Sequence, residues 1–122
     1  MTREFIMTPE FDKMWAQLGL DDDNLKVLQE QILINPHIGA VIQGTGGLRK
    51  MRFALNAGKS SGVRVLYVYL VLLEEVYLIS AYAKSNKSNL TSNEKSEIKK
   101  LIDLLKKSAF ERRAKNELRK YY

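Results

Sequence analysis

The sequence predicts an α+β domain in which two N-terminal helices and one C-terminal helix pack on an antiparallel sheet. Three observations support this fold class: helix-start signals near the N-terminus, β-branched and aromatic residues through the middle, and a capping-box pattern before a late amphipathic stretch. The 122-residue chain has no internal repeat and no low-complexity linker. We therefore expect residues 1–122 to form a single domain with a basic C-terminal extension from about residue 110.

The first elements follow from local signals. Residues 3–7 predict a short edge strand. Thr8 is a favourable N-cap, and Pro9 suits the first position of the helix that follows. A second helix is expected from about Asp22, where acidic residues fill the first turn, to a stop before Pro36.

Three strands and a helix are predicted next. The strands cover Leu48–Leu55, Val63–Leu72 and Val76–Lys84, and their short connections predict an antiparallel meander. The last helix begins at LTSNE, where Thr91 and Glu94 have the capping-box spacing. The residues that this helix is expected to bury are Ile98, Leu101, Ile102 and Leu105.

The stretch GKSSG looks like the end of a Walker-type phosphate-binding loop. That loop needs a glycine five residues before the Gly-Lys pair, where this chain has Phe53. It also opens a helix, whereas the residues after Gly62 are β-branched and aromatic and predict a strand. We therefore expect a hairpin connection that binds neither ATP nor GTP.

The net charge of +6 is unevenly distributed along the chain. The segment Gln31–Leu73 contains no acidic residue. Its five cations are Arg49, Lys50, Arg52, Lys59 and Arg64. This segment therefore predicts an anionic partner, and phosphate is the commonest one.

Alternation along the first central strand puts Lys50 and Arg52 on the face opposite the apolar residues. Arg64 enters the next strand directly after the turn, and Lys84 ends the third strand near Tyr82. We therefore expect these cations to converge on one sheet face. Such a face suits RNA and also metal-free cleavage, in which the RNA 2′-hydroxyl attacks the adjacent phosphorus.

Three other interpretations of this face remain open. Exposed cations on a strand are often merely solvated. The face could also belong to a catalytically silent RNA- or ribosome-binding module, or to a structural adaptor for an acidic protein segment.

Other residues limit the chemistry. His37 is the only histidine, which excludes a two-histidine mechanism, and we expect it in a loop. Gly44, Gly46 and Gly47 are expected to form a tight turn rather than a phosphate nest. No metal-ligand spacing and no nucleophile motif is present, so we expect no metal and no other cofactor. The N-terminus lacks an apolar signal core, and we expect a cytoplasmic location without membrane attachment.

The segments IQGTGGLRKMRFALNAGKSSGVRVLYVYL and VYLISAYAKSNKSNLTSNEKSEI carry a resemblance to a known family. Their pieces GTGGLRKMRFA, GKSSGVRV and YAKSNKSNLT, in that order and spacing, resemble the RelE/HigB toxins of bacterial type II toxin–antitoxin modules, especially the HigB branch. The resemblance runs from about Asn35 to Leu105.

The resemblance implies a compact RelE-like microbial ribonuclease fold. It implies an mRNA interferase, an endoribonuclease that enters the ribosomal A site and inhibits translation by cutting mRNA without a metal. The catalytic residues that it implies are Lys50, Arg52, Arg64 and Lys84. The residues expected to bind RNA are Arg49, Lys59, Tyr82 and Lys87. The general base stays open among Lys84, Lys87 and Tyr82, because SNLTS stands where some relatives carry a tyrosine.

The resemblance also implies a second protein. Toxins of this kind are neutralised by a cognate antitoxin, which in the HigB branch usually has a helix-turn-helix DNA-binding domain. Since no segment of this chain resembles a DNA-reading helix, operator DNA is expected to be bound only through the antitoxin.

Overall fold

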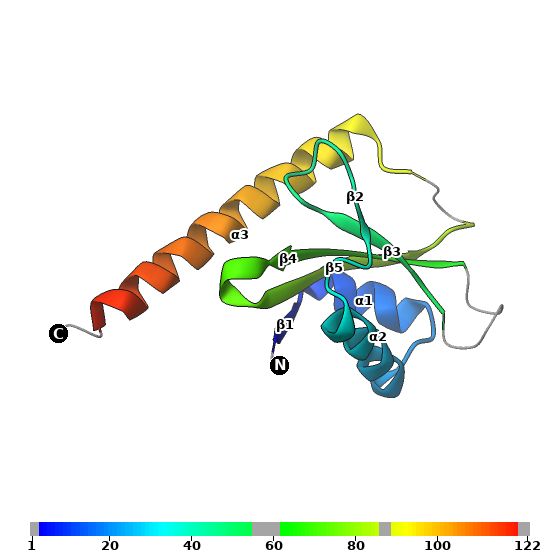
Figure 1. Cartoon of the computed structure of the whole chain (residues 1–122). Helices are drawn as coiled ribbons and strands as arrows, with labels where there is room; N and C mark the ends of the chain where they lie inside the picture. Colours follow the sequence, from blue (N-terminus) through cyan, green and yellow to red (C-terminus); the bar gives the residue numbers. More distant parts are fainter. Residues whose placement is uncertain (1–2, 55–61, 86–88, 120–122) are drawn as a thin grey trace.

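The computed structural model describes residues 3–54, 62–85 and 89–119, which form a five-stranded sheet with helices on both faces (Figure 1). The elements are β1 (Glu4–Met7), α1 (Pro9–Gln17), α2 (Asp22–Ile34), β2 (Ala40–Val41), β3 (Arg49–Phe53), β4 (Val63–Leu70), the 3₁₀-helix η1 (Val71–Leu73), β5 (Glu75–Ala83) and α3 (Ser92–Arg119). The predicted α+β class and the predicted set of three helices are confirmed.

The strand order across the sheet is β1-β5-β4-β3-β2. The pairs β3–β4 and β4–β5 are antiparallel, which confirms the predicted meander. The predicted N-terminal edge strand is also present, and it lies parallel to β5. At the other edge is β2, which the sequence did not predict. The strands β3 and β4, which flank the GKSSG stretch in the sequence, are antiparallel neighbours. Residues 55–61 lie outside the described residues, so the hairpin predicted for GKSSG stays a prediction.

The helices begin where their capping residues predict. Thr8 accepts a hydrogen bond from the first turn of α1 at 3.1 Å. Asp21 and Asn24 exchange side-chain and backbone hydrogen bonds at the start of α2, at 2.8 and 2.9 Å. Thr91 and Glu94 do the same at the start of α3, at 2.9 and 3.1 Å. These bonds satisfy backbone N–H groups that a helix leaves without partners.

One face of the sheet packs against α1 and α2. Aromatic side chains dominate this core: Trp15 stacks on Phe11 and also contacts Phe53, with ring centroids 5.3 Å apart in both pairs. The other fully buried members of this core are Leu28, Ile32, Val65, Tyr67, Val76, Leu78 and Ala81. The alternation predicted for β3 is confirmed, because Met51 and Phe53 point into this core.

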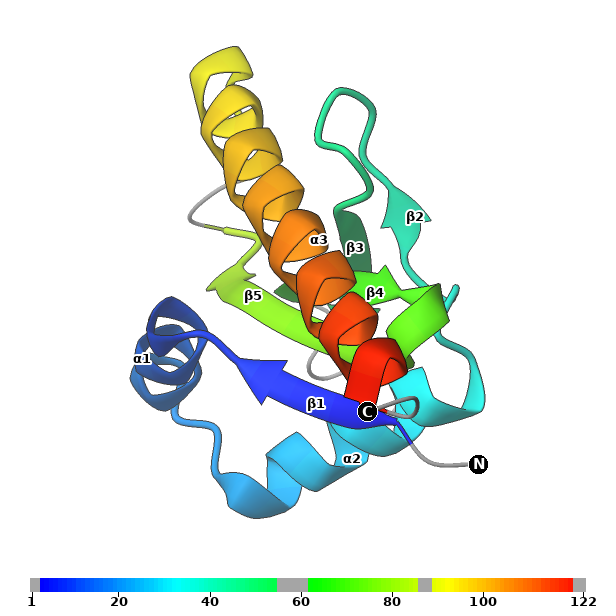
Figure 2. The same ribbon diagram turned by 90° about the vertical axis from the view of Figure 1, so that its left-hand side faces the viewer.

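The long helix α3 crosses the other face of the sheet (Figure 2). Ile102 and Ala109 of α3 are buried against sheet residues including Leu66 and Ile79. The prediction that Leu101 is buried is wrong: it is 38% exposed, because it lies at the margin of the stripe that faces the sheet. The extension beyond residue 110 continues as helix, so α3 is about 42 Å long at 1.5 Å per residue.

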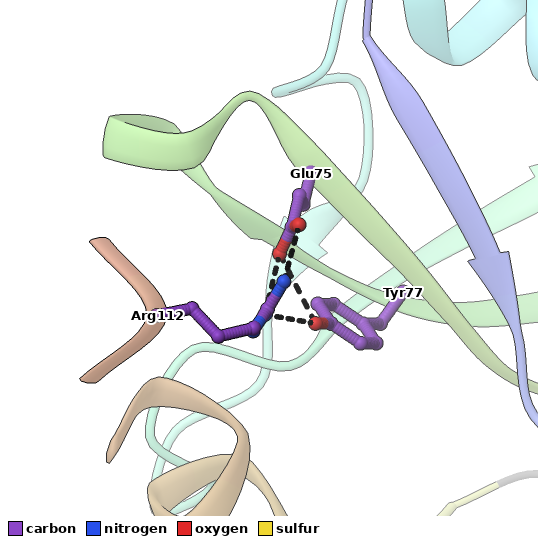
Figure 3. Close-up of polar contacts among 3 residues, drawn as sticks. All are labelled: Glu75, Tyr77 and Arg112. Carbon is purple, nitrogen blue, oxygen red and sulfur yellow. Dashed lines mark hydrogen bonds and ion pairs between the residues drawn. The ribbon is translucent and has the colours of Figure 1, made fainter. Parts of the chain in front are cut away.

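A polar cluster fastens the C-terminal half of α3 to the start of β5 (Figure 3). The Arg112 guanidinium donates hydrogen bonds to both carboxylate oxygens of Glu75, at 3.1 and 3.2 Å, and to the Tyr77 hydroxyl at 3.1 Å. The Tyr77 hydroxyl in turn donates to Glu75 at 3.1 Å. The Arg112 hydrogen bonds hold the pKa of the buried Glu75 carboxyl below its usual value.

A register shift interrupts the β4–β5 pairing between Leu66 and Tyr67. Leu66 lies opposite Ser80, but Tyr67 lies opposite Leu78, so β5 carries one extra residue there. As a result Tyr77 and Tyr82, which are an odd number of positions apart, both face α3.

Candidate nucleic-acid interface

Three polar side chains line up across the three central strands, near one end of the sheet. Arg52 on β3 lies opposite Arg64 on β4, and Arg64 lies opposite Tyr82 on β5. Side chains directly opposite each other in antiparallel strands have Cβ atoms about 4.5–5.5 Å apart. Arg52, Arg64 and Tyr82 therefore form one continuous row, here called the cationic row. The row lies on the face of the sheet that α3 crosses. Tyr82 packs in the same hydrophobic cluster as Ile102 of α3, and Arg52 alternates along β3 with residues that are buried on the other face.

Lys50 extends this arrangement by one step along β3. It pairs with Leu66, on the same face as Arg52, and its side chain is half-buried. The predicted convergence of Lys50, Arg52 and Arg64 is confirmed by the register. Arg52 and Arg64 are like charges directly opposite each other, and such pairs destabilise a sheet. An anion bound between the two guanidinium groups would reduce this repulsion.

Lys84 lies one residue beyond the end of β5 rather than within it. Its backbone N–H donates a hydrogen bond to the Gly62 carbonyl, which places it at the same end of the sheet as the cationic row. The side chain is exposed. Lys59 and Lys87 lie outside the described residues, so their RNA-binding roles stay predictions.

Arg49 is not part of the row, because it points to the opposite face of β3. Its guanidinium donates to the Gly39 carbonyl at 2.7 Å and lies 3.0 Å from Nδ1 of His37. Tyr67, which pairs with Arg49, accepts a hydrogen bond from the Gly39 N–H at 2.9 Å and donates to the Pro36 carbonyl at 2.8 Å. Burial raises the pKa of Tyr67. Arg49 and Tyr67 thus hold the loop that leads into β2, and His37 is a loop residue, as predicted.

The sequence already carried the signal that separates Arg49 from the other cations. Arg49 has the same parity as Met51 and Phe53, which are core residues, whereas Lys50 and Arg52 have the other parity. Grouping these residues by charge alone obscured that difference. An RNA contact from Arg49 stays a prediction, but it would lie away from the cationic row.

A groove beside the row was not predicted. It has a volume of about 590 Å³ and lies between α1, β5 and α3, with Tyr82 and Ser80 in its wall. Apolar side chains form most of the remaining wall, and Glu10 and Glu94 add carboxylates. Sequence periodicity could not indicate this groove, because it depends on how far α1 and α3 stand apart across β5.

The glycine-rich segment before β3 forms a turn, as predicted. Gly44, Gly46 and Gly47 all adopt positive φ values, of 83°, 77° and 121°. The Gly46 carbonyl accepts a hydrogen bond from Lys106 of α3 at 2.6 Å, so the turn is fastened to the helix. Within residues 3–54, 62–85 and 89–119, no three His, Asp or Glu side chains gather closely enough to hold a metal ion. None of the helices in these ranges is both long enough and apolar enough to cross a membrane.

Comparison with known proteins identifies the fold. No family model matches the sequence. A free Escherichia coli RelE toxin with two arginines replaced by alanine is similar, with a TM-score of 0.52 and 21% identity over 72% of this chain and 90% of that one. The intact E. coli RelBE toxin–antitoxin complex is similar with a TM-score of 0.51 and 21% identity, over 67% of this chain and 96% of the matched chain. Isolated E. coli RelE is similar with a TM-score of 0.51 and 19% identity, over 82% of this chain and 99% of that one. The chain therefore has the fold of the RelE toxin.

Proposed function

We propose that this chain is the toxin of a type II toxin–antitoxin module, of the HigB branch, and that it cleaves mRNA on translating ribosomes. The observation that carries the proposal is the cationic row with Lys50 beside it, on a sheet with the RelE fold. RNA is the partner class that matches this charge, because guanidinium and ammonium groups hold phosphodiesters by charge-assisted hydrogen bonds.

The proposed chemistry uses the RNA as its own nucleophile. The 2′-hydroxyl loses its proton and its oxygen bonds to the adjacent phosphorus, while the bond from phosphorus to the 5′-oxygen breaks and that oxygen takes up a proton. The products are a 2′,3′-cyclic phosphate, or its hydrolysis product, and a 5′-hydroxyl end. No metal enters these steps.

The residues divide into two roles. Arg64, with Lys50 or Arg52, would stabilise the negative charge that builds on the phosphate oxygens in the transition state. Lys84, with Lys87 or Tyr82, would transfer the protons. His37 is excluded from proton transfer at the row, because it contacts Arg49 on the opposite face.

The partners follow from the same proposal. The mRNA would be met in the ribosomal A site, and a cognate antitoxin of the helix-turn-helix type would neutralise the toxin. Operator DNA would be bound only through that antitoxin. The RelBE complex is one solved case of this fold with an antitoxin.

Mapping mRNA ends tests the activity. Inducible expression in a bacterium should arrest growth and create new 5′-hydroxyl ends within translated messages. Arg64→Ala should abolish these ends, while Lys26→Ala, which removes an exposed cation from α2 on the other side of the sheet, should leave them unchanged. Growth arrest without new mRNA ends would contradict the nuclease proposal.

The position of Lys84 supports a second candidate function. Lys84, which is proposed to transfer protons, lies one residue beyond β5, whereas Arg52 and Arg64, which are proposed to bind phosphate, are held opposite each other by strand pairing. The same row would serve a non-catalytic RNA- or ribosome-binding module. Purified protein that binds ribosomes and slows translation with every message intact would establish this alternative.

A further inference from the structure

Three large apolar side chains are exposed together at the far end of the β4–β5 hairpin. Val71 and Leu72 of η1 are 58% and 63% exposed, and Phe110 of α3 is 58% exposed. They line one pocket of about 190 Å³. We call Val71, Leu72, Phe110 and the pocket between them the turn patch.

The fold itself does not require this exposure. The residues of α3 that cover the sheet are spaced as one helical stripe through Ile98, Ile102, Leu105 and Ala109, and Phe110 lies beside that stripe. Val71 and Leu72 belong to a connection that makes no sheet pairing. Clustered apolar exposure of this kind on a soluble surface marks an interaction site.

The rim of the patch is positively charged. Lys106, Phe110 and Arg113 are spaced four and three residues apart, so they share one face of α3. Lys106 already donates to the Gly46 carbonyl, whereas Arg113 has no hydrogen-bond or ion-pair partner among the described residues. A ligand that matches both features carries a large apolar side chain flanked by carboxylates.

This chemistry selects a protein segment over the other occupants. RNA is a poor match, because most of the pocket wall is apolar and offers few hydrogen-bond donors for phosphates. A second copy docked patch to patch would bring Lys106 and Arg113 of both copies together, since a two-fold contact pairs the same surface with itself. An acidic amphipathic segment has neither defect.

The turn patch is separate from the cationic row. Arg64 and Leu70 stand near opposite ends of β4, and six residues of strand span about 20 Å. A segment bound at the patch would therefore leave the row uncovered, and it would inhibit by obstructing the ribosome rather than by blocking the phosphate site.

We propose that the turn patch anchors an acidic amphipathic segment of the antitoxin, an inference that rests on the proposed function. The apolar residue of that segment enters the pocket between η1 and α3, and its carboxylates face Lys106 and Arg113. The antitoxin is thus held at a site that is separate from the cationic row, so a substitution in the turn patch would weaken antitoxin binding without impairing cleavage.

The test uses two exposed apolar residues of α3, one that lines the patch and one that does not. Phe110→Asp places a charge in the patch, whereas Leu104→Asp places the same charge at a residue that is 65% exposed and does not line it. The probe is the purified small protein encoded beside this chain, titrated against each full-length variant. We expect Phe110→Asp to raise the Kd at least about 10-fold, as for a buried anchor residue, and Leu104→Asp to leave it unchanged.

A second pair tests the charged rim. Arg113→Glu and Lys107→Glu change the net charge equally, but only Arg113 lines the pocket. Arg113→Glu should weaken the antitoxin complex more than Lys107→Glu does. Equal effects of the two substitutions would show that general electrostatic attraction, rather than the patch, holds the antitoxin.

Growth assays separate this inference from the proposed function. If Phe110→Asp still arrests growth but co-expressed antitoxin no longer rescues it, both proposals stand. If rescue and Kd are unchanged, the patch proposal is overturned while the toxin proposal stands. If the wild-type chain does not arrest growth, the Kd comparison still decides about the patch, and a probe that fails to bind wild-type protein overturns it. Self-association or RNA binding that Phe110→Asp abolishes would also overturn it, by showing a different occupant.

Discussion

Arg112 on α3 and Glu75 on β5 are joined by two parallel hydrogen bonds, although 37 positions separate them in the chain. The Glu75 side chain is 6% exposed and that of Arg112 is 49% exposed, so the pair bridges the core and the surface. This contact connects the one long helix to the sheet that carries the cationic row. Its removal is the first test of how the fold is held together.

We expect Arg112→Ala to destabilise the protein by about 1–3 kcal/mol, because it leaves the buried Glu75 carboxylate with too few donors. In a domain of this size the change should lower Tm by roughly 3–5 °C per kcal/mol. Arg113→Ala is the matched control, as it removes the neighbouring guanidinium and breaks no bond among the described residues. Equal unfolding curves for the two variants would contradict a structural role for the pair.

The Glu75 pair should also make stability depend on pH. Since Arg112 lowers the pKa of Glu75 in the folded state, the stabilisation is complete above the usual carboxyl pKa of 4.5 and is lost as pH falls through the lower folded value. Glu75→Gln should therefore be less stable than wild type at pH 7, and the difference should shrink in acid. Urea unfolding from pH 7 to pH 3 measures this. Asp103→Asn, which alters an exposed pair with Lys99, should show little of the effect.

Arg52→Thr should stabilise the fold and impair cleavage at once. Arg52 and Arg64 are like charges directly opposite each other, and relief of that repulsion is worth about 0.2–1 kcal/mol. If the row stabilises the transition state, loss of one preorganised cation lowers the cleavage rate about 10²- to 10³-fold. Thermal unfolding and single-turnover cleavage on programmed ribosomes measure the two effects. A variant that loses stability, or that cleaves at the wild-type rate, would contradict this account of the row.

Tyr67→Phe should loosen the loop before β2. The Tyr67 hydroxyl bonds both the Gly39 N–H and the Pro36 carbonyl, and its loss leaves two buried backbone groups without that partner, at a cost of about 1–3 kcal/mol. Amide hydrogen exchange should rise at residues 37–41. Tyr69→Phe is the matched control, because the only contact of the Tyr69 hydroxyl among the described residues is a long one to Arg3, at 3.4 Å. Unchanged exchange in Tyr67→Phe would show that Arg49 alone holds the loop.

Local signals predicted those parts of the fold that local interactions determine. Thr8 and Thr91 begin helices because their side chains satisfy backbone groups a few residues away. The parity of Met51 and Phe53 predicted the face of β3 that is buried, and hence the exposed side of Arg52. The convergence of Arg52 with Arg64 followed from the antiparallel pairing expected of consecutive strands, and the register that places them directly opposite each other comes from the structure.

The remaining features depend on contacts distant in sequence. The strand β2 is two residues long and has no pattern of its own, since it exists only by pairing with β3. The burial of Leu101 was mispredicted because the angle of α3 across the sheet decides which side of its apolar stripe is covered. The bond from Arg112 to Glu75 could not be inferred, because many cations on α3 were equally plausible partners for that carboxylate.

The extra residue in β5 sets the phase of everything that follows it on that strand. Upstream of it, Glu75 and Tyr77 point toward α3; downstream, Tyr82 does so only because the alternation has been reset by one. Glu75 and Tyr77, which bind Arg112 of α3, and Tyr82, which ends the cationic row, therefore lie on the same side of β5. They do so although the bulge shifts the alternation between them by one residue. Deleting Ile79, the residue between Leu78 and Ser80, would make the alternation regular and leave Tyr82 four positions from Tyr77, still toward α3. A register in which Ile79 is paired rather than bulged would instead turn Tyr82 toward α1, so the bulge at this one residue decides whether Tyr82 joins the row.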